Sequence, residues 1–223
     1  AQGLGLVVRG LTATGLPGLY RELSRFYADR ESRDELPMLG IVSEELARIV
    51  EGEVPVPEPE PLPVTRLLAR IDAGDDPVLG SFLDLAGVLP WTQTRVYLDA
   101  LPAEFIRNYG YVRLVGPGDG AVVHSERVAL GVGVWGAGLH YPRHAHPAEE
   151  AYHVLAGEVR FRGAGGVSRE LSPGTPGDCA RNGPDEPHEL WFGAPGGIEK
   201  LDPEMHPPCV LAWAWVGEIG VDA

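Results

Sequence analysis

The middle of the chain carries polar, titratable side chains at alternating positions. They are two histidines, a glutamate and a tyrosine, all at even-numbered positions: His144, His146, Glu150 and Tyr152. Because side chains of one parity share a face of a β-strand, we expect these four to point to one place, from adjacent strands or from one strand bent at Pro147. Imidazole and carboxylate groups together suit zinc, iron(II), manganese(II) and nickel(II). The spacing therefore predicts a site for one divalent transition-metal ion, with the phenol facing it.

A fourth ligand for this ion should come from a strand more distant in the sequence. The best candidate is His188, because a proline-containing turn leads directly into a strand-like run at this position. A lone histidine is more often a hydrogen-bonded core residue than a ligand. The HxHxxxE spacing together with a distant histidine favours a metal site over that interpretation.

The remaining histidines are not assigned to this site. His153 has the parity opposite to that of the glutamate and tyrosine, so it should face away. His124 and His206 lie in turn-like contexts without a partner, and His140 is ambiguous, because the tyrosine and proline after it redirect the chain. These positions are interpreted as structural.

The elements that must position the site are short strands in the second half of the chain. From about residue 109, strand-like runs such as "YVRLVGP", "AYHVLAGEVRFRG" and "CVLAWAWVGEIG" alternate with turns that contain glycine and proline. This even spacing is typical of an all-β sandwich or barrel, which we expect over residues 109–223. Trp191, Trp213 and Trp215 fall in these strands, and burial in a core or an interface is favoured for the last two.

Residues 1–108 are predicted to be a helical accessory region. Apolar residues at helical spacing, or short runs bounded by turns, predict helices over 19–30, 43–50, 64–72 and 77–88. An acidic, proline-rich stretch over 51–63 excludes a helix interior or a central strand and is interpreted as a linker or extended arm. The region carries no cluster of ligands or nucleophiles. We therefore expect it to cap the barrel or to build a homodimer interface.

Composition limits the classes of partner. The chain has 223 residues, 44% hydrophobic and 22% charged, and a formal net charge of −14 at pH 7, which disfavours nucleic acid and anionic membranes as partners. No run of about 18 apolar residues predicts a membrane span, and no signal-peptide pattern is present at the start, so a cytoplasmic protein is expected.

Two cysteines, Cys179 and Cys209, are too few for a disulfide framework. Reduced thiols are favoured, and one disulfide stays open.

Two segments resemble the motifs of the cupin family. The segment "GLHYPRHAHPAEEAYHVLAG" matches the first motif, G-x5-H-x-H-x3-E-x6-G, at every fixed position: Gly138, His144, His146, Glu150 and Gly157. The segment "PGDCARNGPDEPHEL" resembles the second motif, a Pro-Gly-Asp turn with a histidine ten residues after Asp178. The trailing asparagine of that motif is absent. The resemblance implies a mainly β fold, with a C-terminal cupin double-stranded β-barrel after the N-terminal helical region.

A narrower resemblance is to the cupin-type dimethylsulfoniopropionate lyases. It rests on Tyr152, two residues after the metal glutamate, on Tyr141, nine residues before that glutamate, and on helices preceding the barrel. The resemblance implies a metal-dependent carbon–sulfur lyase that cleaves this zwitterionic small molecule by β-elimination to dimethyl sulfide and acrylate. It also implies that Tyr152 is the base, acting as a phenolate, and that Tyr141 contacts the substrate.

Two other functions remain open at this stage. One is a different cupin metalloenzyme, a dioxygenase or an isomerase, in which Tyr152 would not react itself. The other is a non-enzymatic cupin that binds a small molecule, although such sensors usually carry a basic DNA-binding module, which this acidic chain lacks. No P-loop, dinucleotide fingerprint or G-x-S-x-G nucleophile motif is present in the sequence.

Overall fold

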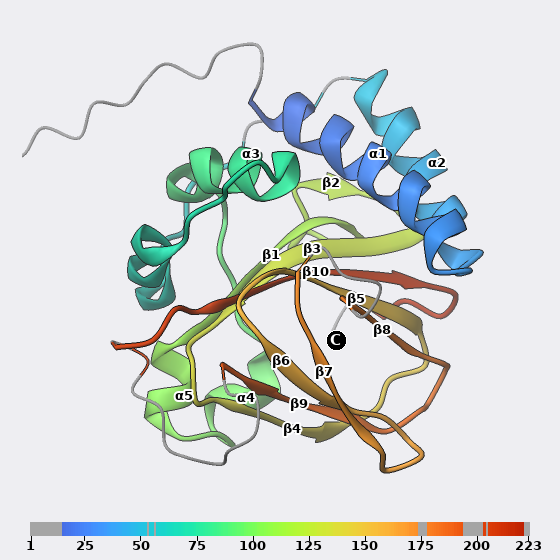
Figure 1. The fold of residues 1–223 in the computed structure, drawn as a ribbon. Coiled ribbons are helices and arrows are strands. Elements are labelled where there is room, and N and C mark those ends of the chain that lie inside the picture. The colour runs from blue at the N-terminus through green and yellow to red at the C-terminus, as the bar shows by residue number, and fades with distance from the viewer. Residues whose placement is uncertain are drawn as a thin grey trace, which may run out of the picture.

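Two β-sheets of unequal size face each other, and helices from the first part of the chain cover the outer face of the larger sheet (Figure 1). The computed structural model describes residues 15–52, 54–55, 57–173, 178–193, 203 and 205–220. A mainly β fold with N-terminal helices is thereby confirmed. The two sheets are separate hydrogen-bonded ladders over these residues, so closure into a double-stranded barrel stays a prediction.

The larger sheet has six strands in the order β2-β1-β3-β10-β5-β8, and it is antiparallel except for the pairing of β1 with β2. Its strands are β1 (Tyr109–Gly116), β2 (Val123–His124), β3 (Val128–Trp135), β5 (Glu149–Ala156), β8 (Cys179–Asn182) and β10 (Cys209–Val216). Both faces of its central strands are buried: the helices cover one face and the smaller sheet the other.

The smaller sheet has four antiparallel strands in the order β4-β9-β6-β7. They are β4 (His140–His144), β6 (Val159–Arg162), β7 (Ser168–Leu171) and β9 (His188–Phe192). The first cupin-motif glycine, Gly138, precedes β4, and the last, Gly157, lies between β5 and β6. Both adopt a positive φ, 83° and 77° respectively, which explains why glycine stands at these turns.

The predicted helices are present, and the first two are longer than expected. They are α1 (Leu16–Arg33), α2 (Met38–Val50), the 3-10 helices η1 (Pro63–Arg70) and η2 (Ala86–Val88), and α3 (Pro77–Leu85). The side chain of Asp76 caps α3 by accepting a hydrogen bond from the Leu79 amide at 2.9 Å, and Pro77 occupies the first turn. Two short helices before the sheet, α4 (Arg95–Leu98) and α5 (Ala103–Arg107), were not predicted.

Helix α1 is bound to the larger sheet by apolar packing and by tyrosine hydroxyls. Its buried residues recur at helical spacing and share one core with β1, β3 and β10. Tyr20 donates a hydrogen bond to the Leu114 carbonyl at 2.7 Å, and Tyr27 donates one to the Trp213 carbonyl at 3.4 Å. Strand β1 starts at Tyr109, but because the helices and the sheet share a core, the division into two domains at this point stays a prediction. The homodimer is likewise a prediction.

No helix in the described part of the chain has the length and apolarity that a bilayer crossing requires.

Candidate metal centre and active site

Three histidines meet between the two sheets, as their spacing predicts. His144 ends β4 and pairs in register with His188 at the start of β9, and His146 lies just beyond β4. Ring centroids are 4.2 Å apart for the paired histidines and 5.3 Å apart for His146 and His188. One nitrogen from each ring lies within 4.8 Å of the others, so the three can bind a single ion.

Backbone contacts fix which nitrogen of each ring is free. In all three histidines Nδ1 lies within hydrogen-bonding distance of a backbone carbonyl. Because a carbonyl can only accept, Nδ1 carries the proton in each ring and Nε2 keeps its lone pair. Metal-binding histidines are oriented in the same way, by donating the other ring N–H to a protein acceptor. The contacts are His144 to Pro142 at 2.8 Å, His146 to Ala148 at 3.0 Å and His188 to Glu186 at 2.9 Å.

The buried carboxylate of Glu150 faces these free nitrogens. Its Oε2 lies 3.0 Å from Nε2 of His146 and 3.1 Å from Nε2 of His188. With both imidazoles neutral, each contact brings two lone pairs together, and Nε2 of the fully buried His188 makes no hydrogen bond. A cation between the three groups satisfies all of them. This donor set, three imidazoles and one carboxylate, therefore fits a divalent transition-metal ion.

For His144 and Glu150 the pKa shifts match the ligand states that such an ion needs. Burial, together with the nearby His188, lowers the pKa of His144 to about 4, so its imidazole is neutral at physiological pH. Burial opposes ionisation of Glu150, but the imidazoles of His146 and His188 beside its Oε2 outweigh it and hold the Glu150 pKa well below its usual range. Neutral imidazole and ionised carboxylate are the forms that coordinate metals.

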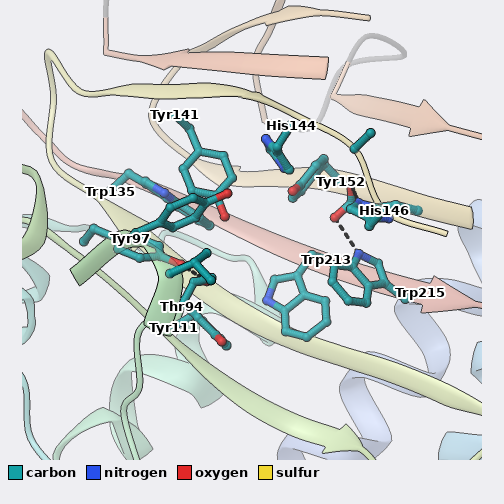
Figure 2. A pocket seen from close by; sticks show the side chains of 14 residues that line it. Thr94, Tyr97, Tyr111, Trp135, Tyr141, His144, His146, Tyr152, Trp213 and Trp215 are labelled. Carbon is teal, nitrogen blue, oxygen red and sulfur yellow. Dashed lines mark hydrogen bonds and ion pairs between the residues drawn. The ribbon is translucent and has the colours of Figure 1, made fainter. Parts of the chain in front are cut away.

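A cavity of about 220 Å³ opens beside the histidines, and its wall is mainly aromatic (Figure 2). Tyr152 projects into it from β5 and Tyr141 from β4, as the sequence predicts for residues near the site. The further lining residues are Thr94, Val96, Tyr97, Tyr109, Tyr111, Trp135, His144, Ala145, His146, Glu150, Trp213 and Trp215.

The two tyrosines singled out from the sequence differ in their neighbours. Tyr152 is buried beside Glu150, and burial together with that negative charge raises the Tyr152 pKa well above 10. Tyr141 packs edge-on against the ring of His144, with centroids 4.6 Å apart, and its ring also contacts Tyr97. Burial also raises the pKa of Tyr141, and the neighbouring tyrosines Tyr109, Tyr97 and Tyr152 add to the effect. Both hydroxyls are therefore phenols in the absence of added positive charge.

Comparison with known proteins decides the family. The family model described as dimethylsulfoniopropionate lyase matches residues 45–193, which include the site residues and the helices α3 to α5. The chain belongs to the dimethylsulfoniopropionate lyase family.

Individual lyases resemble the chain to different extents. Dimethylsulfoniopropionate lyase DddQ of Ruegeria pomeroyi is 37% identical over 94 residues, which cover 42% of this chain and 45% of that protein. The putative dimethylsulfoniopropionate lyase DddL of Cereibacter sphaeroides is 29% identical over 181 residues, covering 79% of this chain and 69% of DddL. The chain thus spans less than half of DddQ and about two thirds of DddL.

Solved lyase structures share the fold. The crystal structure of DddQ from Ruegeria pomeroyi superposes with a TM-score of 0.58 at 25% identity, covering 81% of this chain and 91% of that one. A chain from the structures of the lyases RdDddP and RnDddQII superposes with a TM-score of 0.65 at 21% identity, covering 94% and 97%. The arrangement of helices and sheets is therefore that of solved dimethylsulfoniopropionate lyases.

In this lyase-family member the expected core burial is confirmed for Trp213, which is 6% exposed and belongs to an apolar core, and Trp215 packs against that core while partly exposed. Both indoles also line the cavity. Parity could not show this, because it places them on the inner face of the sheet without showing where the opposite sheet stands away from it. Gly131, opposite Trp213 on β3, helps to make this room, because a Cβ there would lie 2.7 Å from the indole. Trp191 instead faces outward and stacks on His140, with centroids 4.6 Å apart.

Several contacts at this site could not be predicted from the sequence. Tyr97 reaches the cavity from the unpredicted α4, and Trp215 donates a hydrogen bond from Nε1 to Oε1 of Glu150 at 2.6 Å. Asn182 donates from Nδ2 to the other oxygen of the same carboxylate at 3.0 Å. These contacts depend on the register between strands far apart in the chain. No signal in a single sequence reports that register.

His153 faces away from the cavity, as its parity predicts, and belongs to a second cluster under α1. Its Nε2 lies 3.1 Å from Asp34, and Cys179 stands beside it on β8. These three could hold a metal by proximity alone. However, Arg33 already donates to both oxygens of Asp34, at 2.7 and 3.0 Å, and Arg30 and Arg33 both contact the buried Asp178. We therefore interpret this cluster as a network of ion pairs.

Other sequence expectations have mixed outcomes. Both cysteines, Cys179 and Cys209, are free thiols, as favoured. His124 was expected in a turn without a partner, which is wrong: it ends β2, and its Nε2 lies 3.0 Å from Glu126. His140, which was ambiguous, contacts Glu189 at 3.0 Å on the outer face of the smaller sheet. His206 is exposed.

Proposed function

We propose that this protein is a metal-dependent carbon–sulfur lyase that cleaves dimethylsulfoniopropionate by β-elimination to dimethyl sulfide and acrylate. The family membership and the lyase structures support this activity. The observation that carries the proposal is the cluster of three histidines and Glu150 beside an aromatic cavity, with a buried tyrosine next to the carboxylate. The cavity and the donor set together match a small cationic carboxylate as substrate.

The proposed ligands of the ion are His144, His146, Glu150 and His188. When bound, a divalent ion such as zinc, iron(II) or manganese(II) supplies a Lewis acid for the substrate carboxylate and positive charge that favours the Tyr152 phenolate. The protein keeps the three imidazoles in the Nδ1–H form through its backbone carbonyls. The Nε2 lone pairs are thus fixed before an ion arrives, which lowers the entropic cost of binding it.

The aromatic wall suits the other end of the substrate. A sulfonium ion is attracted to the faces of Trp and Tyr rings in the way that ammonium ions are. Trp213, Tyr111 and Tyr97 present such rings to the cavity (Figure 2). Tyr141, between His144 and Tyr97, is the proposed contact to the part of the substrate nearer the ion. The two ends of the molecule are thereby oriented along the cavity.

Tyr152 is the proposed base. As a phenolate it removes the proton from the carbon next to the substrate carboxylate, and the electron pair of that C–H bond becomes the carbon–carbon double bond of acrylate. The bond from the β carbon to sulfur breaks at the same time, and its electron pair leaves on neutral dimethyl sulfide. The leaving group therefore needs no proton, and the tyrosine, left as a phenol, releases its proton to solvent before the next turnover. A positioned base of this kind contributes about 10²–10⁴-fold.

We propose a reducing, cytoplasmic location, which the two free thiols support. Helices α1 to α3 are proposed to act as a cover for the outer face of the large sheet, without a catalytic role.

Headspace measurement of dimethyl sulfide from protein purified without chelator, with and without oxygen, tests the proposal. Equal release in both atmospheres, one equivalent of acrylate per sulfide and about one bound metal per chain are the expected results. Activity that needs oxygen would indicate a dioxygenase. Tight binding of the substrate without turnover would indicate a binding protein.

A further inference from the structure

The carboxylate of Glu150 receives a hydrogen bond from each of its two neighbouring strands. In the antiparallel registers, Glu150 stands opposite Trp215 of β10 on one side and Asn182 of β8 on the other. Trp215 donates from Nε1 to Oε1 at 2.6 Å, drawn as a dashed line in Figure 2, and Asn182 donates from Nδ2 to Oε2 at 3.0 Å. Side chains opposite each other share a face of the sheet, so the register itself places a donor on each side.

These two donors distinguish the two oxygens of the carboxylate. Oε1 is turned towards the indole, whereas Oε2 faces Nε2 of His146 and of His188, at 3.0 and 3.1 Å. The terminal torsion of a glutamate is broad and has no strong intrinsic preference. Without the indole and amide donors, nothing in the side chain itself would hold Oε2 towards the imidazoles. The donors are therefore what fixes this rotation.

Trp215 also contacts a second ligand directly. Its ring lies against the imidazole of His146, with centroids 4.4 Å apart and planes inclined by 33°. The indole therefore limits the positions of two proposed ligands. Its N–H holds the carboxylate of Glu150, and its ring face packs against the imidazole of His146. Asn182 is 1% exposed, so its amide has no competing solvent contact.

We propose that Trp215 and Asn182 are positioning residues of the metal centre, which orient Glu150 with Oε2 towards the three imidazoles before an ion binds and thereby set the affinity for the ion. This rests on the proposed function, because it requires a metal at this site. Residues that orient metal ligands in other proteins typically change metal affinity 10–100-fold when replaced. A preoriented carboxylate avoids the entropic cost of being ordered on binding.

Two substitutions isolate the donors. Trp215→Phe keeps an aromatic ring on His146 and removes the N–H, and Asn182→Leu keeps the approximate volume and removes the amide. The dissociation constant of Zn²⁺ is measured by competition with a chromophoric chelator, and Co²⁺ absorption reports the ligand arrangement. Each variant should bind Zn²⁺ about 10–100-fold more weakly and show an altered Co²⁺ spectrum. The matched control, Trp91→Phe, removes another buried indole N–H, which donates to the Ala86 carbonyl and shares no partner with Glu150, and it should stay within about threefold of the unmodified protein.

The affinities separate this proposal from its alternatives. A purely structural role would lower the melting temperature of the metal-free variants and leave both the Zn²⁺ constant and the Co²⁺ spectrum unchanged, which would overturn the proposal. If Trp215→Phe does not fold, Asn182→Leu decides the question alone. Failure of the unmodified protein to bind Zn²⁺ or Co²⁺ would overturn both the positioning role and the metal centre. Tight binding without release of dimethyl sulfide would overturn only the lyase activity, because the affinities still test the positioning role.

Discussion

Strand β5 separates two buried clusters that contain the same kinds of side chain. On its inner face, Glu150 lies among three histidines whose free nitrogens point at it. On its outer face, His153 lies beside Asp34. Arg33 of α1 forms ion pairs with both Asp34 and Asp178, and Arg30 forms one with Asp178. Over the described residues, the charged partners of Glu150 are histidines alone, whereas the outer carboxylates have guanidinium groups.

The difference shows how surroundings decide what a cluster of histidines and carboxylates can do. Where the protein supplies its own fixed cations, the carboxylate lone pairs are occupied and the cluster stabilises the packing of a helix on a sheet. Where it supplies only neutral imidazoles, the lone pairs of their nitrogens face those of the carboxylate without a proton between them. A divalent cation from solution can then bind between these groups. The outer cluster should therefore contribute stability and the inner cluster metal binding.

Removing an inner ligand should have the largest effect. His188→Ala takes away a fully buried nitrogen that makes no hydrogen bond, so metal content should fall well below one per chain and release of dimethyl sulfide should become undetectable. The measurement is metal analysis beside the headspace assay. A variant with one metal per chain and normal turnover would show that the fourth ligand is assigned wrongly.

Breaking the outer cluster should instead cost stability. Asp178→Asn removes a buried charge that two arginines contact, which should lower the free energy of unfolding by about 3 kcal/mol. The metal dissociation constant should stay within about threefold of the unmodified protein, because the inner ligands are untouched. Chemical denaturation measures the free energy of unfolding, and a separate Zn²⁺ titration of the folded protein measures the dissociation constant. Normal stability with weakened metal binding would reverse the roles assigned to the two faces.

The outer cluster should also give stability that depends on pH. Burial opposes ionisation of Asp34, but hydrogen bonds from His153 and Arg33 outweigh it and hold the Asp34 pKa well below its usual range. A lowered pKa in the folded state stabilises the protein above the unfolded value of about 3.9 and loses that effect as pH falls towards the folded pKa. Asp34→Asn should therefore be less stable by about 2 kcal/mol at pH 7, and the gap should shrink from pH 5 to pH 3. If the difference in unfolding free energy between the variant and the unmodified protein is the same at pH 3 as at pH 7, the lowered Asp34 pKa is not its origin.

Changing the thiol of the outer cluster should have almost no effect on metal content. Burial raises the pKa of Cys179 to about 12, with Asp34 and Asp178 adding to the effect, so the thiol stays protonated and is a poor ligand. Cys179→Ser should keep the same number of zinc ions per chain as the unmodified protein in equilibrium dialysis. A second ion, lost in this variant, would show that the outer cluster is a metal site after all.

Local spacing made the inner site predictable to the extent that it lies on one stretch of chain. His144, His146, Glu150 and Tyr152 follow the two-residue period of a strand, and a motif spacing connected them to His188. The helices of the first part were predictable for the same reason, since their apolar residues recur at helical spacing.

Contacts between distant segments could not be predicted in this way. The pairing of Glu150 with Trp215 and Asn182 depends on strand register, and the contact of Asp34 with His153 depends on how α1 lies on the sheet. The strands β4 and β8 are short, so their own patterns were too weak to predict their bounds. Tertiary packing, which a single sequence does not show, fixes all of these features.

The central claim, that Tyr152 on the inner face is the base of a lyase, is tested most directly by one pair of tyrosine substitutions. Tyr152→Phe and Tyr27→Phe each remove one buried hydroxyl from opposite sides of the larger sheet, and Tyr27 only donates to the Trp213 carbonyl. The rate of dimethyl sulfide release should fall by at least about 10²-fold in Tyr152→Phe with metal content retained, and should stay near normal in Tyr27→Phe. Retention of more than about a tenth of the turnover by Tyr152→Phe would contradict the account.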